Sequence, residues 1–205
     1  NAVVGLTMDG RSGGTGSTVL WTIQNTTTSS AGPAIQFNSG ANTNTIQYLN
    51  LQSSNQTATS GTVYFNAATA TNTGNIIQNC NLGANGSTYP LNGICAYATY
   101  PYQNNNTQIL NNQIHDFVSS GTATASGVIV TGTGTNTDYA DNWTITGNSL
   151  YRTVANNVTD YLITGINFLA SPTSSGTSTG HTISNNTIGG NAAVTGGSAP
   201  SGVWI

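Results

Sequence analysis

The sequence has very little charge. Its 205 residues include two Arg, five Asp and neither Lys nor Glu, which gives a net charge of −3. Proteins that bind nucleic acids or acidic membrane surfaces need clusters of Lys and Arg. No apolar run approaches the roughly 18 residues of a membrane-spanning helix. We therefore expect neither a nucleic-acid partner nor membrane insertion.

Cysteine is also scarce, with one residue at Cys80 and one at Cys95. Two interpretations stay open, a disulfide between them or two free, partly buried thiols. Ile94 and Ala96 align with an inward-facing pair in the next repeat, so Cys95 between them should point outward. Good helix formers are rare, and no stretch keeps the apolar spacing of a helix. These absences favour an all-β protein.

A step of the form apolar-x-x-Z-x-apolar recurs along the chain, with Asn at Z in the last three of its five copies, and its starts are 31, 32, 36 and 38 residues apart. The copies are Ile46/Leu49/Leu51, Ile77/Cys80/Leu82, Ile109/Asn112/Ile114, Ile145/Asn148/Leu150 and Ile183/Asn186/Ile188. A second motif, Gly followed by β-forming residues, falls between these copies and keeps step with them. Its copies begin at Gly61, Gly93, Gly127, Gly165 and Gly202.

A period of 20 to 50 residues is typical of a solenoid, whose units bury their apolar faces by stacking. The short alternating runs predict strands, and the lack of crossover helices predicts that they pair in parallel between coils. We expect a parallel β-helix of about six coils. Residues 1–17 would form a lead-in strand and turn, and residues 18–205 the β-helix itself.

The Asn of the recurring step should lie at a bend between two strands, because Asn tolerates left-handed backbone geometry. Stacking of the coils would bring Asn112, Asn148 and Asn186 together about 4.8 Å apart. We expect them to form a ladder of amide hydrogen bonds along the solenoid axis.

These motifs resemble the right-handed parallel β-helix repeat proteins of the pectate-lyase-like group, over roughly residues 18–205. The phrase Leu6-Thr-Met-Asp-Gly-Arg-Ser-Gly-Gly-Thr-Gly also looks like the opening of β-helix segments in large secreted bacterial surface proteins. The resemblance implies a right-handed fold. It does not select a function, because lyases, hydrolases, adhesins and surface fibres share that fold.

Catalytic residues, if any, should come from the region richest in ionisable groups. The candidates are Asp116, Asp138, Asp141, Asp160 and Arg152. Related β-helix hydrolases use clustered aspartates, and related lyases use Ca²⁺-bound acidic groups with a basic residue. No full signature of either enzyme matches, and the alignment instead places Asp116 beside Arg152 as a surface ion pair. Asp138 and Asp141 form either a weak Ca²⁺ site or part of a solvated loop; we expect no other cofactor.

The densest aromatic cluster consists of Tyr97, Tyr100 and Tyr102. Aromatic rings beside amide side chains are suited to binding sugar rings. The competing interpretation is that these tyrosines cover the side of a coil.

Two hypotheses about function remain. The first is a non-enzymatic structural or adhesive module, secreted or on the cell surface, whose partners are copies of itself or the rest of a longer chain. The second is a carbohydrate-binding or polysaccharide-cleaving domain. The sequence stops within an expected strand, Gly202-Val-Trp-Ile, so we expect a longer parent chain or an open end that stacks on another molecule.

Overall fold

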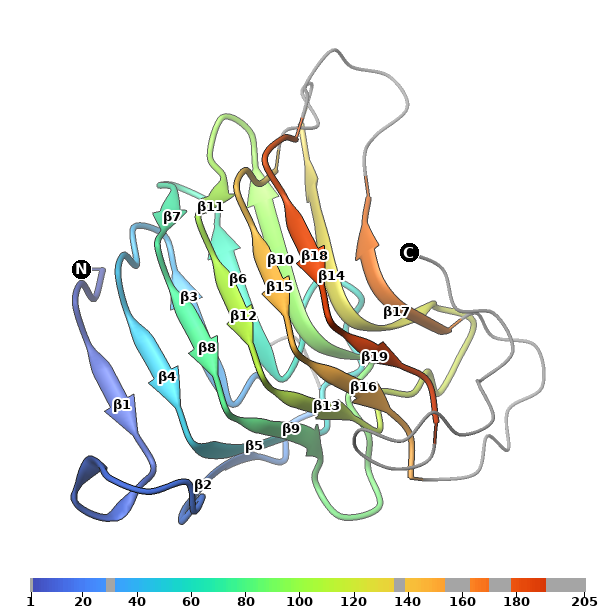
Figure 1. Cartoon of the computed structure of the whole chain (residues 1–205). Coiled ribbons are helices and arrows are strands. Elements are labelled where there is room, and N and C mark those ends of the chain that lie inside the picture. The colour runs from blue at the N-terminus through green and yellow to red at the C-terminus, as the bar shows by residue number, and fades with distance from the viewer. Residues whose placement is uncertain (1, 29–31, 135–138, 154–162, 170–177, 191–205) are drawn as a thin grey trace.

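The chain folds as a parallel β-solenoid, seen in a computed structural model that describes residues 2–28, 32–134, 139–153, 163–169 and 178–190 (Figure 1). Strands make up 48% of the structure, and the described residues complete about four turns. The expected all-β β-helix is confirmed, with fewer turns than the six predicted. In the first coil, a Gly-rich segment at residues 10–16 separates the first strand from the second. The expected last strand, residues 202–205, lies outside the described residues.

Three parallel sheets run along the solenoid, each built from strands that stack from one coil to the next. The first sheet contains, in spatial order, β1 (Thr7–Asp9), β4 (Thr45–Gln47), β8 (Ile76–Gln78), β12 (Gln108–Leu110), β15 (Thr144–Thr146) and β18 (Thr182–Ser184). The second contains β2 (Trp21–Asn25), β5 (Leu49–Ser53), β9 (Asn81–Ala84), β13 (Gln113–His115), β16 (Ser149–Tyr151) and β19 (Thr187–Ile188). The third contains β3 (Ile35–Asn38), β6 (Val63–Ala67), β10 (Asn92–Thr99), β14 (Ala125–Thr133) and β17 (Ile163–Phe168).

Two smaller elements complete the described structure. β7 (Asn72–Thr73) pairs with β11 (Asn104–Asn105) at the corner before the first sheet, and a short 3-10 turn, η1 (Ser12–Gly14), follows β1. Within the described ranges, no helix has the length and apolar character needed to cross a bilayer.

The recurring apolar step forms the register of the sheets. Ile77 pairs with Ile46 on one side and with Ile109 on the other, and the same column continues through Ile145 to Ile183. The column keeps its register although the repeats differ in length. The repeat therefore specifies which residues stack from coil to coil.

Left-handed backbone geometry occurs at the corner between the first two sheets, as predicted, but not at the expected residue. The positive φ belongs to the residue just before the fourth position of the step: Tyr48 (53°), Asn79 (53°), Asn111 (54°), Gly147 (72°) and Asn185 (54°), of which the last three precede the ladder asparagines. Asn and Gly adopt this conformation at low cost. The residue that makes the left-handed turn and the residue that forms the ladder are therefore different, whereas the sequence predicted a single Asn for both roles.

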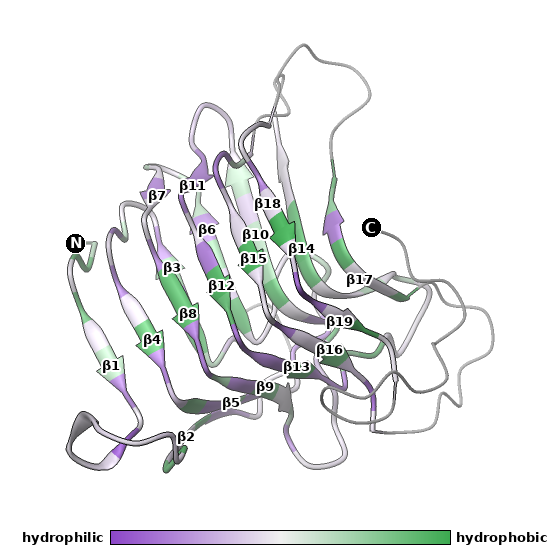
Figure 2. Cartoon of the chain, in the orientation of Figure 1, coloured by the Kyte–Doolittle hydropathy of each residue, from purple (hydrophilic) through white to green (hydrophobic). Residues whose placement is uncertain are grey.

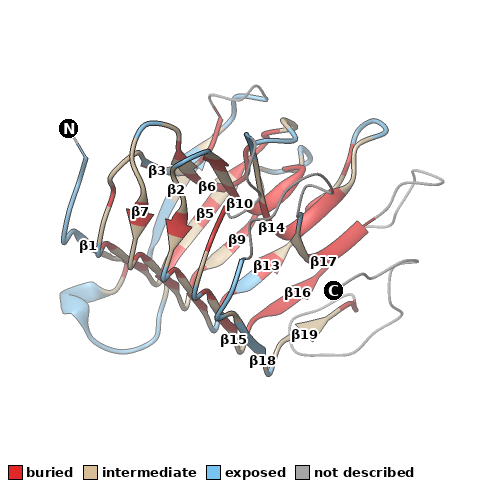
Figure 3. Ribbon diagram, turned by 90° about the horizontal axis from the view of Figure 1, so that it is seen from above, coloured by how far each residue is buried: buried red, intermediate tan, exposed pale blue. Residues whose placement is uncertain are grey.

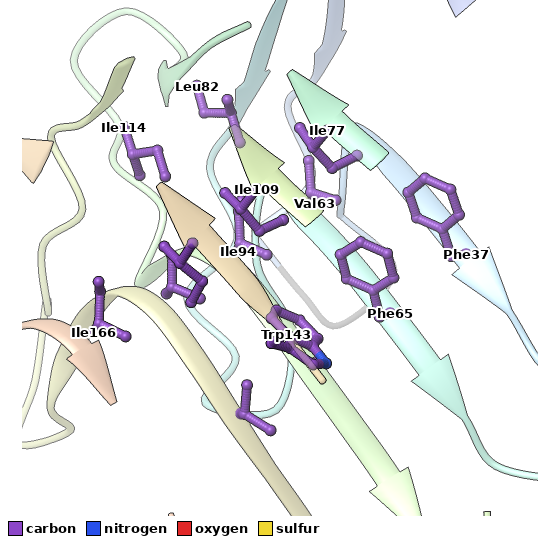
Figure 4. Close-up of a cluster of buried hydrophobic side chains, with 14 of the residues drawn as sticks. Phe37, Val63, Phe65, Ile77, Leu82, Ile94, Ile109, Ile114, Trp143 and Ile166 are labelled. Carbon is purple, nitrogen blue, oxygen red and sulfur yellow. The ribbon is translucent and has the colours of Figure 1, made fainter. Parts of the chain in front are cut away.

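The core is a narrow apolar column enclosed by the sheets (Figure 2). Phe37 stacks on Phe65 with ring centroids 4.5 Å apart, and the edge of Trp143 packs against Phe65 at 5.9 Å. Aliphatic residues such as Ile77 and Ile109 fill the next layer (Figure 4). Burying each such side chain contributes on the order of 1.5–3 kcal/mol.

The glycines of the second motif are needed because side chains from the neighbouring coil occupy the space of a Cβ. A Cβ at Gly93 would lie 2.4 Å from Cγ2 of Ile114, and one at Gly127 would lie 2.4 Å from Cδ2 of Leu150. Gly165 repeats the arrangement in the next coil. At these three glycines, side chains of the second sheet therefore reach the backbone of the third.

Both cysteines are free and buried. Cys80 belongs to the core, and burial raises the pKa of its thiol to about 11. Cys95 lies outside the core cluster, between the core residues Ile94 and Ala96, yet it is fully buried, and burial raises its pKa as well. Of the two interpretations left open by the sequence, the structure contains free thiols.

Candidate functional site

The predicted asparagine ladder lies at the corner between the first and second sheets. Nδ2 of Asn112 donates to Oδ1 of Asn148 at 3.0 Å, and Nδ2 of Asn148 donates to Oδ1 of Asn186 at 2.9 Å. Each amide oxygen also accepts the backbone N–H of the preceding ladder residue at 2.9 Å. Asn112 and Asn148 are 1% exposed. The ladder therefore satisfies buried backbone groups rather than presenting a binding surface.

A second set of buried amides was missed by the sequence analysis. At the corner before the first sheet, Nδ2 of Asn44 donates to Oδ1 of Asn75 at 3.0 Å, and Nδ2 of Asn72 donates to Oδ1 of Asn104 at 2.9 Å. All four residues are at most 2% exposed. The Asn that recurs just before the apolar step, as in Asn44-Thr-Ile and Asn75-Ile-Ile, was the signal that could have revealed the first pair.

Asp116 is held in a hydrogen-bonded cluster with His115 and the next coil. Its carboxylate contacts Nδ1 of His115 at 2.8 Å and accepts bonds from N and Oγ1 of Thr153 at 2.7 and 2.8 Å. Although burial opposes ionisation, the bonds from His115 and Thr153 together lower the pKa of Asp116. The other ring nitrogen of His115 lies 2.9 Å from Oδ1 of Asn81. Both ring nitrogens are thus in contact with side chains of the protein.

The predicted ion pair between Asp116 and Arg152 does not form. Asp116 is bonded to Thr153 and His115 instead, and the two salt bridges among the described residues are Arg11–Asp9 and His115–Asp116. Arg152 is only 7% exposed, and its Nε and Nη1 have no hydrogen-bond partner. The repeat placed the two residues in adjacent coils correctly. The ion pair was predicted wrongly because the carboxylate of Asp116 accepts hydrogen bonds from Thr153, the residue after Arg152. Burial lowers the pKa of Arg152.

Among the described acidic candidates, Asp141 does not join Asp116. Asp141 precedes the first sheet, at a different corner, and its Oδ1 accepts the N–H of Thr179 at 2.7 Å. This bond repeats one made by Asn105, whose Oδ1 accepts the N–H of Asp141 at 2.8 Å. Asp138 and Asp160 lie outside the described residues. Within the described part of the chain, no group of three or more His, Cys, Asp or Glu is placed to hold a metal.

The three candidate sugar-binding tyrosines have different environments. Tyr102 packs partly buried against the core, whereas Tyr100 is 46% exposed. Tyr97 lies on the outer face of the third sheet, and its hydroxyl lies 3.2 Å from Oγ1 of Thr133. Of the three, Tyr100 is thus the exposed one, whereas Tyr97 and Tyr102 are partly buried.

The end of the solenoid formed by β1, β2 and β3, here called the β1–β3 end, carries five of the eight exposed large hydrophobic side chains among the described residues, and Figure 3 shows exposed segments beside β1. Its exposed large side chains are Val3 (53%), Val4 (63%), Leu6 (42%), Leu20 (55%) and Trp21 (58%). A cavity of about 270 Å³ opens there, and Met8, Ile35, Phe37 and Ile46 line its walls. Between the two ends of the solenoid, the equivalent positions are covered by the next coil. This end is the candidate functional site.

Charge at the β1–β3 end is neutralised locally. Arg11 binds Asp9 through Nε and Nη2, with the shorter contact at 2.6 Å, and its guanidinium lies 4.1 Å from the ring centroid of Tyr48. The hydrogen bond from Arg11 lowers the pKa of Asp9. The pair thus leaves the rim of this end with no uncompensated charge from either residue.

Comparisons with protein-family profiles, with curated proteins and with solved structures returned no match. The functional argument therefore rests on the geometry of the solenoid itself.

Proposed function

We propose that this chain is a structural or adhesive module of a secreted or cell-surface protein, and that copies of itself or further parts of a longer chain stack on its ends. We also place it with the right-handed pectate-lyase-like β-helices, because of its repeat pattern. The observation that carries the functional proposal is the apolar β1–β3 end with its cavity of about 270 Å³. An exposed patch of this kind marks an interaction surface.

The use of the polar side chains supports the same proposal. Asp9 is paired with Arg11, Asp116 is committed to Thr153 and His115, and Asp141 accepts a bond from the next coil. In the ladders, the amide side chains likewise form hydrogen bonds with backbone groups, in the same geometry from coil to coil. Polar groups used in this way hold coils together, whereas an active site needs several of them to converge on one substrate.

The test of the proposed setting is localisation. Antibodies raised against the chain should detect it in the surface or extracellular fraction of the cells that produce it. A cytosolic marker protein, followed in the same fractions, controls for lysis. Detection in the cytosolic fraction alone would overturn the proposal.

A second candidate function is carbohydrate binding, and the exposed ring of Tyr100 together with the outward Tyr97 favours it. Flat aromatic surfaces beside Asn66 and Thr133 are suited to stacking on a sugar ring. The test is affinity electrophoresis in gels containing soluble polysaccharides, comparing the native chain with Tyr100→Ala. Retardation of the native chain that Tyr100→Ala removes would establish binding; equal mobility with and without polysaccharide would exclude it. Release of reducing ends from the same polysaccharides would reveal cleavage.

A further inference from the structure

Among the described residues, the first and second sheets each end in strands with one unpaired edge. β1 and β2 are the terminal strands at one end of the solenoid, and β18 and β19 are terminal at the other. The free edge of a strand offers N–H and C=O groups to any strand that adds beside it. Both ends can therefore accept a further coil by continuing the parallel ladders.

The two ends carry the same side-chain pattern. In the first sheet, the column that begins at Thr7 ends at Thr182, and the column that begins at Met8 ends at Ile183. Thr7 and Thr182 are exposed, whereas Met8 packs against the core. A β18 strand placed beside β1 would thus set Thr opposite Thr on the outside and Ile opposite Met on the inside.

The second sheet repeats this match. Its column from Ile23 passes through Leu51, Leu82, Ile114 and Leu150 to Ile188. Ile23 and Ile188 are both partly buried and packed against the core. The same displacement along the axis therefore satisfies both sheets.

The cavity supplies the volume that such a contact needs. Met8, Ile46 and Phe37 line a space of about 270 Å³, which is larger than an aliphatic side chain. At the opposite end of the same column, Ile183 is 40% exposed. Insertion of Ile183 beside Met8 would bury apolar surface on both partners.

We propose that the β18–β19 end of a second copy of this chain docks on the β1–β3 end, with Thr182 opposite Thr7 and Ile188 opposite Ile23. This rests on the proposed structural role and specifies its partner and register. Each copy offers one face of each kind, so the contact is head to tail and does not close on itself. Repetition of the contact produces an open filament in which the first and second sheets run on from copy to copy.

A disulfide trap tests the contact and its register. Thr7→Cys and Thr182→Cys place thiols on the outer face of the two edge strands. Within one molecule these positions are separated by five strand spacings, about 24 Å, whereas a disulfide requires Cα atoms within about 7 Å. Any disulfide between them therefore joins two copies. The native Cys80 and Cys95 are at most 2% exposed and give the background of the measurement.

The two single variants are purified, mixed under mild oxidation and analysed by non-reducing electrophoresis and mass spectrometry of the linked peptide. The control pair is Thr7→Cys with Ser184→Cys, since residue 184 lies on the same face of β18 but two residues out of register. We expect about tenfold more mixed dimer from the 7/182 pair than from the 7/184 pair, because only the first places the thiols at bonding distance. A chain carrying both Thr7→Cys and Thr182→Cys should form a ladder of covalent multimers.

Three outcomes would overturn the docking proposal: no mixed dimer, equal yields from the two pairs, or a native chain whose mass by light scattering stays monomeric as its concentration rises. Failure of the proposed function is recognised separately by cell fractionation. A surface protein without cross-links contradicts only the docking contact, and a cytosolic protein with register-specific cross-links contradicts only the location.

Discussion

Oδ1 of Asn148 accepts two hydrogen bonds from Asn112, one from its backbone N at 2.9 Å and one from its Nδ2 at 3.0 Å. Asn148 in turn donates to the backbone oxygen of Ile109 at 2.8 Å and to Asn186 at 2.9 Å. One side chain thus joins three coils. The position is buried, so water cannot replace these bonds.

The first prediction follows from that contact. Asn148→Ala should lower the free energy of unfolding by about 3 kcal/mol, because it leaves several buried donors and acceptors without partners. The control is Asn50→Ala, whose amide bonds lie on the outer face of the second sheet, and we expect a change within about 0.5 kcal/mol. Urea denaturation followed by circular dichroism measures both. Equal losses in the free energy of unfolding would show that the inner ladder stabilises the fold no more than amide bonds on the outer face do.

The second prediction concerns the glycine motif. Gly127→Ala introduces a Cβ that would lie 2.4 Å from Leu150 Cδ2 and 2.7 Å from the carbonyl oxygen of Gly165. We expect a loss of about 1–3 kcal/mol or failure to fold, since the core must shift to admit the methyl group. Gly121→Ala is the control, because nothing lies within 4 Å of its added Cβ. Thermal melting compares the two, and an unchanged melting temperature for Gly127→Ala would contradict the packing described.

A third prediction concerns pH. The folded state lowers the pKa of Asp116 below the ordinary value of about 3.9, so the unfolded state binds the proton more readily. The stabilisation is complete above that ordinary pKa and is lost as the pH falls through the folded pKa. Melting temperature measured from pH 6 to pH 2 should therefore fall below about pH 4.

Asp116→Asn should flatten that decline, because an amide does not titrate, and should cost about 1.5–3 kcal/mol near neutral pH through the lost charged bonds. Thr153→Val removes one hydroxyl donor and keeps the backbone bond, so we expect an intermediate slope. If Asp116→Asn melts with the same pH dependence as the native chain, the carboxylate does not contribute to acid sensitivity.

A fourth prediction concerns Arg152. Its guanidinium is buried with Nε and Nη1 unpaired, a costly arrangement for a charged group. Arg152→Met keeps the apolar stem and removes the charge, so we expect stabilisation by about 1–4 kcal/mol. Chemical denaturation measures the change, and Arg11→Met, which removes a bonded surface guanidinium, is the comparison. A large loss of stability in Arg152→Met would show that this charge has a partner that stabilises it.

The sequence predicted some residues of the site better than others. Asn112, Asn148 and Asn186 could be assigned to one column because they keep step with buried isoleucines. Arg152 and Asp116 were also assigned to adjacent positions correctly, yet no ion pair formed. Register gives the place of a backbone, whereas side-chain partners depend on nearby groups such as Thr153, which the repeat does not specify.

The sequence by itself determined the parallel β-solenoid, its register and its inner ladder. Each of these depends on a local pattern repeated in every coil, so stacking like on like satisfies all copies at once. Only the tertiary structure decided which residue makes each left-handed turn, why the motif glycines are required, and that the β1–β3 end opens into an apolar cavity. These depend on distances between coils, which are set by packing in three dimensions and leave no single periodic signal in the chain.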